Sequence, residues 1–209
     1  MKVKGFQDTI DWYTKNAKVY ADAGYAKPPY DLIDKFSRLL PHTPTILDVG
    51  CGAGRDTGLL AKKRAIATGL DLSKGLLKEA KKRNPELTFI YGNFLDLPFE
   101  DNSFDGIWAH AALVHLETIP EVRKSFREFH RVLKDKGILH IYVKLQRGKE
   151  KTKIVKDTLS NHERFFRYYT EEEIREYLDE LHFTIIDFSI RKDGHDRAEV
   201  TWICIFAKK

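Results

Sequence analysis

Cysteines, long apolar runs and metal-ligand clusters are scarce or absent in this sequence of 209 residues. Cys51 stands in a glycine-rich turn and Cys204 in the last apolar run, which makes a disulfide between them a poor prediction. Two unpaired cysteines fit a reducing compartment, so we expect a cytoplasmic protein. No apolar stretch approaches the roughly 18–20 residues that a membrane span needs, so we expect no membrane partner. No set of Cys, His or carboxylate residues has metal-ligand spacing, so we expect no metal.

Length and charge bound the protein further. A chain of 209 residues predicts one ordinary domain with a substantial core. Its first residues are basic but are not followed by an apolar run, which argues against a signal peptide. The net charge is +5 and the pI about 9.0. A lysine-rich solvated surface accounts for this charge, and attraction to nucleic acid or an anionic substrate is the alternative.

The most informative stretch is residues 45–55. An apolar strand ends there at Asp48, and glycines follow at positions 50, 52 and 54. Glycine permits a tight turn and lets backbone N–H groups approach a ligand closely. A second apolar run ends in Asp71, whose carboxylate can accept hydrogen bonds from both hydroxyls of a ribose. The two features together predict a nucleoside-cofactor site at the carboxyl edge of a parallel sheet.

The spacing of the glycines indicates which cofactor. The dinucleotide fingerprint G-x-G-x-x-G would need glycine at Arg55 or at Thr57, depending on where counting begins. The chain has G-x-G-x-G instead, and residues 48–54 resemble the first motif of the class I S-adenosylmethionine-dependent methyltransferases. Residues 89–99, 103–109 and 131–140 are similar to later segments of the same family. The resemblance is clearest over residues 44–144.

The fold that follows is α/β. Alternating strands and helices, with the resemblance, imply a Rossmann-like doubly wound sheet, mostly parallel and seven-stranded, with helices on both faces and a C-terminal antiparallel β-hairpin. We expect the first five strands at residues 45–49, 66–70, 87–91, 104–108 and 137–144, and helices at residues 55–63, 74–83 and 120–133. Gly137 is expected to stop the last of these helices. A polar turn at residues 192–196 is expected to join the two strands of the hairpin.

The whole chain, 1–209, is interpreted as a single methyltransferase domain. Residues 1–43 form an N-terminal helical cover in which Ile10, Tyr13, Ala17 and Tyr20 predict one amphipathic helix. Residues 44–144 form the cofactor-binding core, 145–169 a polar and mobile cover, and 170–209 the last helix and the β-hairpin. Right-handed crossovers place the ligand crevice outside the first and fourth strands, where the strand order reverses.

The resemblance implies S-adenosyl-L-methionine as cofactor and S-adenosyl-L-homocysteine as product. Asp71 is expected on the ribose, and Asp48 is expected to order the turn. Arg55 is expected to pair either with the carboxylate of the cofactor or with Asp56. The residues assigned to the amino-acid and ribose parts of the cofactor are Asp48, Gly50, Cys51, Gly52, Gly54, Arg55 and Asp71.

The adenine and sulfonium sides involve other residues. Asn93 stands where the family usually has an acidic residue, and its amide oxygen can still accept a hydrogen bond from the adenine amine, with Asp96 as the alternative. Leu72 and Phe94 are expected to flank the adenine, and a backbone N–H of Phe94 or Leu95 to read its ring nitrogen. Ala109 is expected near the sulfonium. Tyr13 and Tyr20 either close over the methionine part or pack in the core.

Two histidines follow the fourth strand, where the acceptor-side residues of the family lie. His110 and His115 are the catalytic candidates, because histidine accepts a proton near neutral pH; a structural role is the alternative for each. There is no Asn/Asp-Pro-Pro-Tyr/Phe tetrapeptide after that strand, which argues against an exocyclic-amine nucleic-acid methylase. No cysteine is placed for a covalent pyrimidine methylase.

Three functions remain for the chain. The favoured one is transfer of a methyl group to an O, N or S atom of a small-molecule acceptor by in-line displacement. The second is an RNA methyltransferase, acting on tRNA or rRNA, with phosphate contacts from basic residues of the 145–169 cover. The third is a non-enzymatic cofactor-binding protein. The basic residues of the cover are Arg147, Lys149, Lys151, Lys153 and Lys156.

Overall fold

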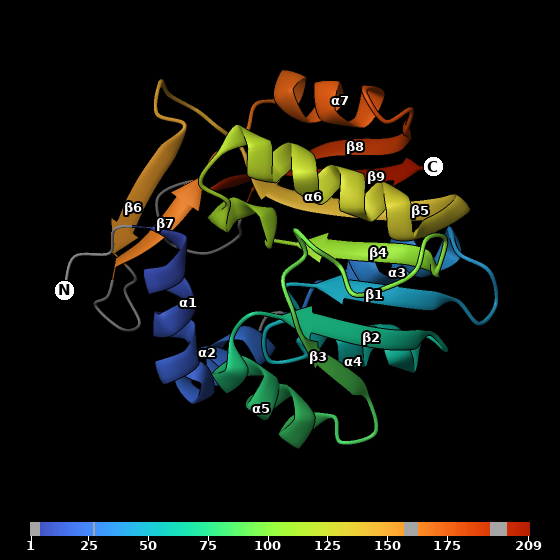
Figure 1. Ribbon diagram of the computed structural model, residues 1–209, viewed down its shortest axis with the longest axis horizontal. Helices are drawn as coiled ribbons and strands as arrows, with labels where there is room; N and C mark the ends of the chain where they lie inside the picture. Colours follow the sequence, from blue (N-terminus) through green and yellow to red (C-terminus); the bar gives the residue numbers. More distant parts are fainter. Residues whose placement is uncertain (1–4, 27, 157–162, 193–199) are drawn as a thin grey trace.

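A seven-stranded sheet forms the centre of the molecule (Figure 1). The computed structural model describes residues 5–26, 28–156, 163–192 and 200–209. The strand order is β3-β2-β1-β4-β5-β9-β8. The first five strands in this order are parallel, and β9 is antiparallel to both of its neighbours, β5 and β8. The predicted fold is confirmed, while the hairpin turn lies almost wholly outside the described residues. The strands are β1 (Thr45–Val49), β2 (Ile66–Asp71), β3 (Thr88–Tyr91), β4 (Phe104–His110), β5 (Leu133–Lys144), β8 (Thr184–Lys192) and β9 (Thr201–Lys208).

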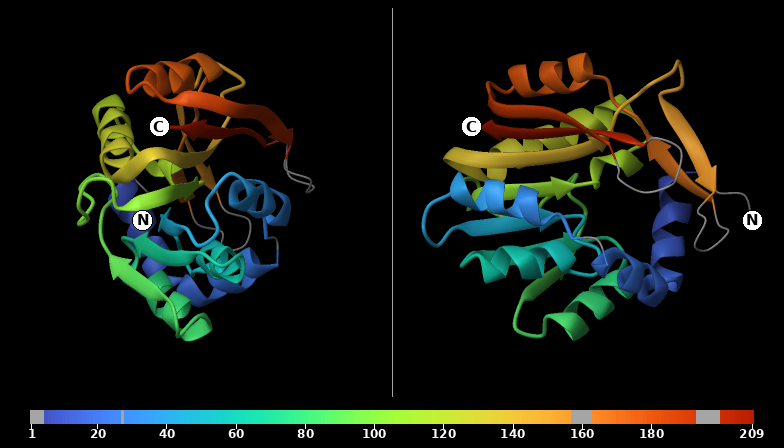
Figure 2. Two further views of the ribbon diagram at one scale, coloured as in Figure 1. Left: turned by 90° about the vertical axis from the view of Figure 1, so that its right-hand side faces the viewer. Right: turned by 180° about the vertical axis from the view of Figure 1, so that it is seen from behind.

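Helices cover both faces of the sheet. Helices α6 (Ile119–Val132) and α7 (Glu171–Asp179) lie on the face that Figure 1 shows in front, and α3 (Tyr30–Arg38) and α4 (Arg55–Lys62) lie on the face that is in front in the right-hand view of Figure 2. Helix α5 (Lys74–Arg83) lies beside α4, so close that a Cβ on Gly58 of α4 would meet Asn84 at the end of α5. The apolar stripe of each helix packs on the strands beneath it, with Phe126 and Phe129 of α6 and Phe36 of α3 almost fully buried.

Three helices begin at side chains that cap them. Ser73 accepts a hydrogen bond from the backbone N–H of Leu76 at 3.2 Å. Thr170 forms a capping box with Glu173, and Thr118 forms a second one with Glu121. These side chains satisfy backbone donors that the first turn of a helix leaves free, which is why the sequence marks the starts so clearly.

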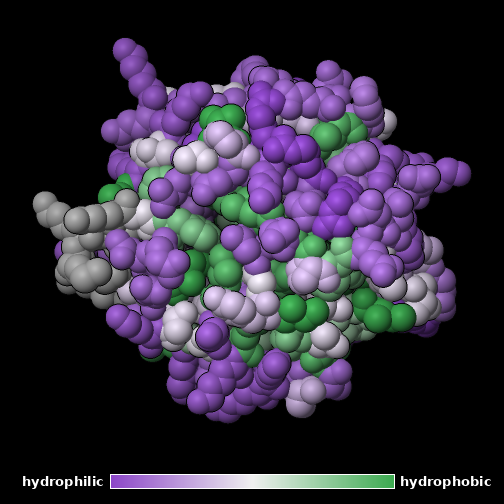
Figure 3. Space-filling view, in the orientation of Figure 1, coloured by the Kyte–Doolittle hydropathy of each residue, from purple (hydrophilic) through white to green (hydrophobic). Residues whose placement is uncertain are grey.

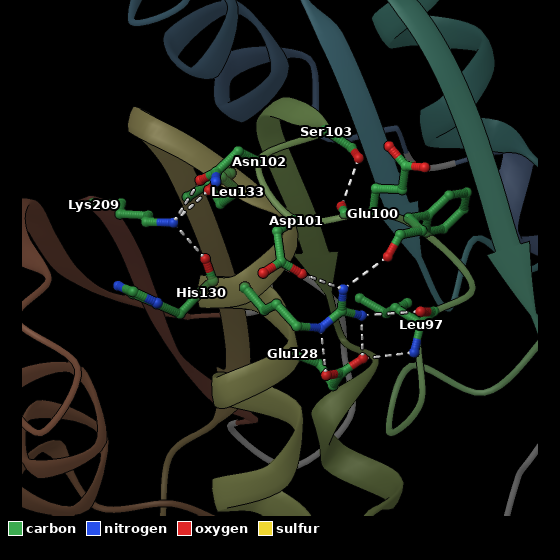
Figure 4. Close-up of polar contacts among 11 residues, drawn as sticks. Leu97, Glu100, Asp101, Asn102, Ser103, Glu128, His130, Leu133 and Lys209 are labelled. Atoms are coloured by element: carbon green, nitrogen blue, oxygen red, sulfur yellow. Dashed lines mark hydrogen bonds and ion pairs between the residues drawn. The ribbon is translucent and has the colours of Figure 1, made fainter.

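The end of α6 differs from the prediction. The helix ends at Val132 and the fully buried Leu133 already begins β5, so Gly137 lies inside the strand. The amine of Lys209 donates to the carbonyls of His130 and Leu133 and to Asn102, at 2.7–3.0 Å (Figure 4). The side chain of a residue remote in sequence thus provides hydrogen bonds to free carbonyl groups at the end of α6. The prediction that Gly137 stops this helix was wrong.

The loop between β3 and β4 is fixed to α6 through Arg131. Its guanidinium donates to the carbonyls of Leu97 and Phe99 and pairs with Glu128 and Asp101 at 2.7–2.9 Å, while Glu128 also accepts from the N–H of Leu97 (Figure 4). Each bond is modest alone, but together they hold the loop that carries Phe94 toward the carboxyl edge of the sheet.

The single amphipathic helix predicted from Ile10, Tyr13, Ala17 and Tyr20 is two helices in the structure. Helix α1 (Phe6–Lys15) and helix α2 (Ala17–Tyr25) meet at Asn16, whose side-chain amide and backbone N–H both donate to the carbonyl of Trp12 at 2.9 Å. Because asparagine competes locally for backbone groups, it interrupts a helix that the apolar spacing alone would continue. The chain turns at Asn16, and both α1 and α2 pack on α5.

The second cover contains a two-stranded antiparallel sheet that the sequence did not predict. Strand β6 (Thr152–Lys156) pairs with β7 (Glu163–Arg167), and Leu145 bridges to Tyr169. Figures 1 and 2 show this sheet beside α1, at the edge of the main sheet where β1, β2 and β4 end. The two covers therefore flank the carboxyl edge that the glycine motif had marked.

The surface in the orientation of Figure 1 is mostly hydrophilic, with apolar side chains visible across the middle of this face (Figure 3). Among the described residues, no helix combines the length and the apolar character needed to cross a membrane.

Candidate functional site

One cavity of about 540 Å³ opens at the carboxyl edge of the sheet, between β1, β4 and the N-terminal helices α1 and α2. Such a volume is within the usual range of about 300–1,000 Å³ for small-molecule sites. Twelve of the predicted site residues line it: Tyr13, Tyr20, Asp48, Gly50, Cys51, Gly52, Arg55, Asp71, Leu72, Phe94, His110 and His115. Four others, Gly54, Asn93, Leu95 and Ala109, are not among the lining residues. Their predicted roles stay predictions.

The glycine-rich turn forms one wall of the cavity. Gly50, Gly52 and Gly54 have φ of +68°, +55° and +76°, a conformation that L side chains adopt rarely. A Cβ on Gly50 would lie 2.7 Å from that of Ala112, whereas a Cβ on Gly52 would meet only Leu76, at 4.0 Å. Gly52 therefore leaves open the space into which a side chain would project, and the backbone itself faces the cavity.

Asp71 joins the turn to the end of β2. One carboxylate oxygen accepts from the N–H of Gly52 at 2.9 Å, and the other accepts from the N–H of Ser73 at 2.7 Å. The residue is 8% exposed, and burial raises its pKa. Each carboxylate oxygen has a second lone pair, so the group can hold the turn and still accept from a ligand hydroxyl.

Two more carboxyl groups lie under the turn. Asp48 accepts from the hydroxyl of Thr57 at 2.6 Å, which ties β1 to α4 as expected of a residue that orders the turn. Asp56 accepts from the indole N–H of Trp108 at 3.0 Å and pairs with Arg55 at 2.6 Å. Burial and the charge of Asp56 raise the pKa of Asp48 to about 8. A cavity-lining carboxyl that titrates near neutral pH can respond to a cationic ligand.

Arg55 was expected to pair with the carboxylate of the cofactor or with Asp56, and the structure shows the ion pair with Asp56. The guanidinium makes two contacts with that carboxylate, at 2.6 and 3.0 Å, and donates to the carbonyl of Gly24 at 3.1 Å. Arg55 therefore links the glycine turn to α2, and its contact with a ligand carboxylate stays a prediction.

The loop that follows β3 forms a local turn at Asn93. The side-chain oxygen of Asn93 accepts from the N–H of Leu95 at 2.9 Å, a local turn typical of asparagine. The Leu95 N–H proposed for an adenine nitrogen is therefore already engaged by the side chain proposed for the adenine amine. Phe94, which is 6% exposed and packs near Phe129, is the residue of this loop that reaches the cavity.

His115 is held by both ring nitrogens. Its Nδ1 lies 2.9 Å from the carbonyl of Phe165, which can only accept, so Nδ1 carries the proton. Nε2 then accepts from the hydroxyl of Tyr13 at 3.1 Å, and Tyr13 accepts from Arg164 at 2.9 Å. Burial lowers the pKa of His115 to about 3. A ligand would have to displace Tyr13 to use this lone pair, so the contacts favour the structural alternative for His115.

The Tyr13–His115 contact also joins the two covers. Arg164 of β7 lies over the rings of Trp12, Tyr13, Tyr20 and Phe166, with its guanidinium carbon 5.3–5.9 Å from the ring centroids. These contacts are cation–π interactions, and they place an arginine above the two tyrosines predicted to meet the cofactor. Tyr13 and Tyr20 line the cavity and pack together, with centroids 4.7 Å apart.

His110 has a different environment. Its Nδ1 lies 3.2 Å from Nε2 of His140, whose own Nδ1 lies 3.2 Å from the carbonyl of Ile205. The carbonyl accepts, so His140 Nε2 must accept and His110 Nδ1 must donate. Nε2 of His110 is left with a lone pair and has no hydrogen-bond partner among the described residues. Burial lowers the pKa of His110 to about 4, so the ring is neutral at physiological pH.

Several cavity residues were missed by the sequence. Tyr142 of β5 and Trp202 of β9 line the end of the cavity around His110, together with Asp31 of α3 and Arg191 of β8. These residues come from four elements spread over the chain, and no local motif marks them. Tyr142 falls in the fifth expected strand and Trp202 in the expected C-terminal hairpin, whose strands the sequence predicts at residues 183–191 and 199–207, but only the strand order brings the two residues together. Within the part of the chain that is described, no three His, Cys, Asp or Glu residues form a group able to hold a metal ion.

Comparison with known proteins agrees with this geometry. Residues 47–141 match the family model of the methyltransferase domain. The chain carries a class I S-adenosylmethionine-dependent methyltransferase domain. It is 36% identical to the sterol 24-C-methyltransferase ERG6B of Gibberella zeae over 104 residues, which cover 46% of this chain and 27% of that protein. It is 39% identical to the 2-phytyl-1,4-naphtoquinone methyltransferase of a Nostoc species over 100 residues, 43% of this chain and 42% of that one. The alignments thus span less than half of these two relatives.

Solved structures share the methyltransferase fold over most of the chain. A methyltransferase of Methanosarcina mazei superposes with a TM-score of 0.78 at 23% identity, covering 88% of this chain and all but 1% of the other. The 1,6-didemethyltoxoflavin-N1-methyltransferase of Burkholderia thailandensis, solved with 1,6-didemethyltoxoflavin and S-adenosylhomocysteine, gives 0.74 at 21% identity and covers 98% of this chain and 86% of that one. At these identities the likeness concerns the fold.

Proposed function

We propose that this protein transfers a methyl group from S-adenosyl-L-methionine to an oxygen, nitrogen or sulfur atom of a small-molecule acceptor. The observation that carries the proposal is one cavity with two unlike ends. The glycine turn and Asp71 lie at one end, and His110, Tyr142 and Trp202 lie at the other. A methyl donor and an acceptor must share a single enclosure for an in-line displacement, and this cavity supports that arrangement.

The residues at the first end fit the cofactor. The positive φ of Gly52 and the open space beside it let its backbone approach a ligand. The buried carboxylate of Asp71 is suited to ribose hydroxyls, and Asp48 to the amino group of the methionine part. Leu72 and Phe94 supply apolar contact for the adenine. When bound, the cofactor supplies the activated methyl group.

The remaining work of the chain is to position the acceptor and exclude water. Helices α1 and α2 line the cavity, and the Arg164–Tyr13–His115 contacts hold β7 against α1. A held geometry of this kind can contribute on the order of 7–11 kcal/mol toward the barrier by alignment alone. A proton acceptor is needed where the acceptor atom arrives protonated, and His110 is the candidate for it.

A small-molecule acceptor is favoured over RNA. Of the basic residues proposed for phosphate contacts, Lys151 pairs with Glu173 at 2.7 Å and Lys153 lies 3.9 Å from Glu150. Acidic neighbours of this kind reduce the pull of a lysine on phosphate. The relatives named for sterol and quinone substrates also favour a small acceptor.

The first test is cofactor binding by calorimetric titration with S-adenosyl-L-homocysteine. Asp71→Ala should weaken binding by at least about 100-fold, because it removes the ribose acceptor and leaves two backbone donors unpaired. Asp179→Ala is the matched control, since Asp179 is exposed at the end of α7 and does not line the cavity. Wild-type affinity in Asp71→Ala, with folding intact, would overturn the ribose assignment.

The second test follows labelled methyl groups from S-adenosylmethionine into a cell extract that is then fractionated by size. Label in the small-molecule fraction supports the proposal, and the mass of the product identifies the acceptor class. Label in nuclease-sensitive polymer would replace the proposal with the RNA alternative. Binding without any transfer would favour the cofactor-binding protein.

A further inference from the structure

Three aromatic residues form a stack at the second end of the cavity, which we call the aromatic ladder: His110 of β4, Tyr142 of β5 and Trp202 of β9. The rings of His110 and Tyr142 are 4.3 Å apart between centroids and 4° from parallel, and those of Tyr142 and Trp202 are 4.7 Å apart and 12° from parallel. All three line the cavity. Tyr142 is covered on both faces by its neighbours, so it meets the cavity with its edge.

The edge of an aromatic ring carries partial positive charge and its face partial negative charge. A ligand ring therefore gains most by laying its face on the edge of Tyr142, in the T-shaped arrangement that aromatic pairs favour. Only a flat ring can make this contact while remaining in the enclosure between the sheet and α3, whose Leu32 and Asp31 line the same end. The aromatic ladder thus selects for planar ligands.

His110 gives the ladder a hydrogen-bond acceptor whose proton state is fixed by its neighbours. The chain of contacts from the carbonyl of Ile205 through His140 fixes the proton of His110 on Nδ1. Nε2 of His110 is then an acceptor and cannot donate unless it is protonated. The buried position that lowers the pKa of His110 keeps this lone pair available at neutral pH. His140 touches no ligand in this arrangement and acts as a positioning residue.

Two ion pairs compensate charges that line the cavity near the ladder. Asp31 pairs with Arg191 at 2.6 Å, and Arg55 pairs with Asp56 at 2.6 Å. Lys192, which also lines this end, is exposed to solvent. A charged ligand group would be desolvated here without a new partner of opposite sign, which is costly. A neutral ligand avoids that cost.

We propose that the aromatic ladder binds a neutral, flat aromatic methyl acceptor whose N–H or O–H group donates to Nε2 of His110. The inference deepens the proposed function and rests on it for the reaction, but not for binding. In the transfer, the acceptor atom uses a lone pair to form its bond to the methyl carbon, and the electrons of the carbon–sulfur bond remain on sulfur. The proton of the N–H or O–H group moves to Nε2 of His110, and the imidazolium later releases it to water.

Three probes of similar size separate the features of the proposal. 2-Naphthol is flat and has an O–H donor, 2-methoxynaphthalene is flat without a donor, and decahydro-2-naphthol has the donor without flatness. Each is titrated calorimetrically into the full chain, with and without saturating S-adenosyl-L-homocysteine. We expect 2-naphthol to bind at least about tenfold more tightly than either of the others, the difference that one hydrogen bond or one aromatic contact supports.

Two variants assign the preference to residues. His110→Phe keeps a stacked ring but removes the acceptor, so 2-naphthol and 2-methoxynaphthalene should bind equally. His140→Phe should instead let the proton of His110 redistribute between Nδ1 and Nε2 and weaken the preference in part. The nitrogen-15 shifts of the His110 ring report the tautomer directly in the wild-type protein, so the argument stays testable if a variant fails to fold.

Each outcome decides a point. Equal binding of 2-naphthol and 2-methoxynaphthalene by the wild-type protein, or an Nε2–H tautomer, would overturn the role of His110. Equal binding of 2-naphthol and decahydro-2-naphthol would overturn the selection for a flat ring. If the protein binds S-adenosyl-L-homocysteine but none of the three probes, this inference is rejected and the proposed function stands. Probe binding without S-adenosyl-L-homocysteine binding would do the reverse.

Discussion

The two ends of the cavity are built by different means. At the end proposed for the cofactor, contiguous residues of one turn line the cavity, and Asp71 from the neighbouring strand accepts from the N–H of Gly52. At the acceptor end, side chains of β4, β5, β9 and α3 meet in space without any sequence relation. A cofactor common to many enzymes can be read by a local backbone motif, whereas the acceptor must be read by side chains that vary with the fold around them. The cofactor end therefore indicates the family and the acceptor end the substrate.

The largest effect should come from changing the backbone wall. Gly52→Val adds a side chain at φ +55° in the space that faces the cavity. We expect S-adenosyl-L-homocysteine binding to fall by about 1,000-fold or more, through steric exclusion and strain of the turn. Calorimetry measures the loss, and 2-naphthol binding should persist. Gly148→Ala, at a position with open space around it, is the control. Near wild-type cofactor affinity in Gly52→Val would remove the distinction between backbone and side-chain recognition.

The same contrast explains what the sequence could predict. The turn at Gly50 and Gly52 was predictable because ligand approach and positive φ demand glycine at fixed spacing. Asp71 was predictable because parallel strands end at one edge of the sheet. Tyr142 and Trp202 could be placed on strands, but their meeting depends on β9 pairing beside β5, which no local pattern states. The loss of the Gly137 stop has the same origin, because Lys209 satisfies the end of α6 from far along the chain.

Local competition accounts for the remaining differences. Asn16 breaks the N-terminal helix by bonding to Trp12, and Asn93 takes the N–H of Leu95 that was expected to face adenine. Asparagine can satisfy a neighbouring backbone group or a ligand, and composition alone does not decide between them. The tertiary position of the loop decides, here through the Arg131 contacts that fix it on α6.

The two ends should also titrate in opposite directions. The pKa of His110 is about 4 when folded, against an ordinary value of 6.5, so the unfolded chain binds more protons between these values. The free energy of unfolding should therefore fall as the pH falls from about 6.5 to 4, by up to about 1.4 kcal/mol per pH unit for this residue. Asp48 has its pKa raised from 3.8 to about 8, so its contribution to the free energy of unfolding should fall as the pH rises through that range.

Difference measurements separate these opposing contributions. Urea unfolding of wild type and His110→Phe between pH 4 and 7 should show a shallower acid slope in the variant. Asp48→Asn should remove the opposing loss of stability that Asp48 causes as the pH rises from about 4 to about 8. His115 is buried elsewhere, remains in both proteins and cancels in the comparison. His140 contacts His110 directly, so the difference between the two curves reports the coupled pair. Parallel curves for wild type and His110→Phe would show that His110 is not buried as a neutral ring.

A smaller effect is expected from the outermost rung of the ladder. Trp202→Ala removes the ring that covers Tyr142 but leaves the glycine turn untouched. We expect 2-naphthol binding to weaken by about tenfold, as one aromatic contact is lost, with S-adenosyl-L-homocysteine affinity within about threefold of wild type. The reverse pattern, weaker cofactor binding with unchanged naphthol binding, would mean that the two ends are not separate sites. Trp202→Phe should restore most of the loss.

The smallest effect should come from the contact that joins the covers above the cofactor end. Arg164→Met keeps an apolar stem but removes the bond to Tyr13 and the cation over the surrounding rings. We expect S-adenosyl-L-homocysteine affinity to fall by about fivefold, since partly exposed cation–π contacts are worth about 0.5–1 kcal/mol each and only part of that energy bears on closure. Hydrogen exchange at the Phe165 amide, which donates to Thr9 across the two covers, should quicken. Lys153→Met, on the exposed side of β6, is the matched control and should leave both quantities unchanged. If the two variants behave alike, the covers do not close on the cofactor through Arg164, and the enclosure depends on apolar packing of α1 and β7 instead.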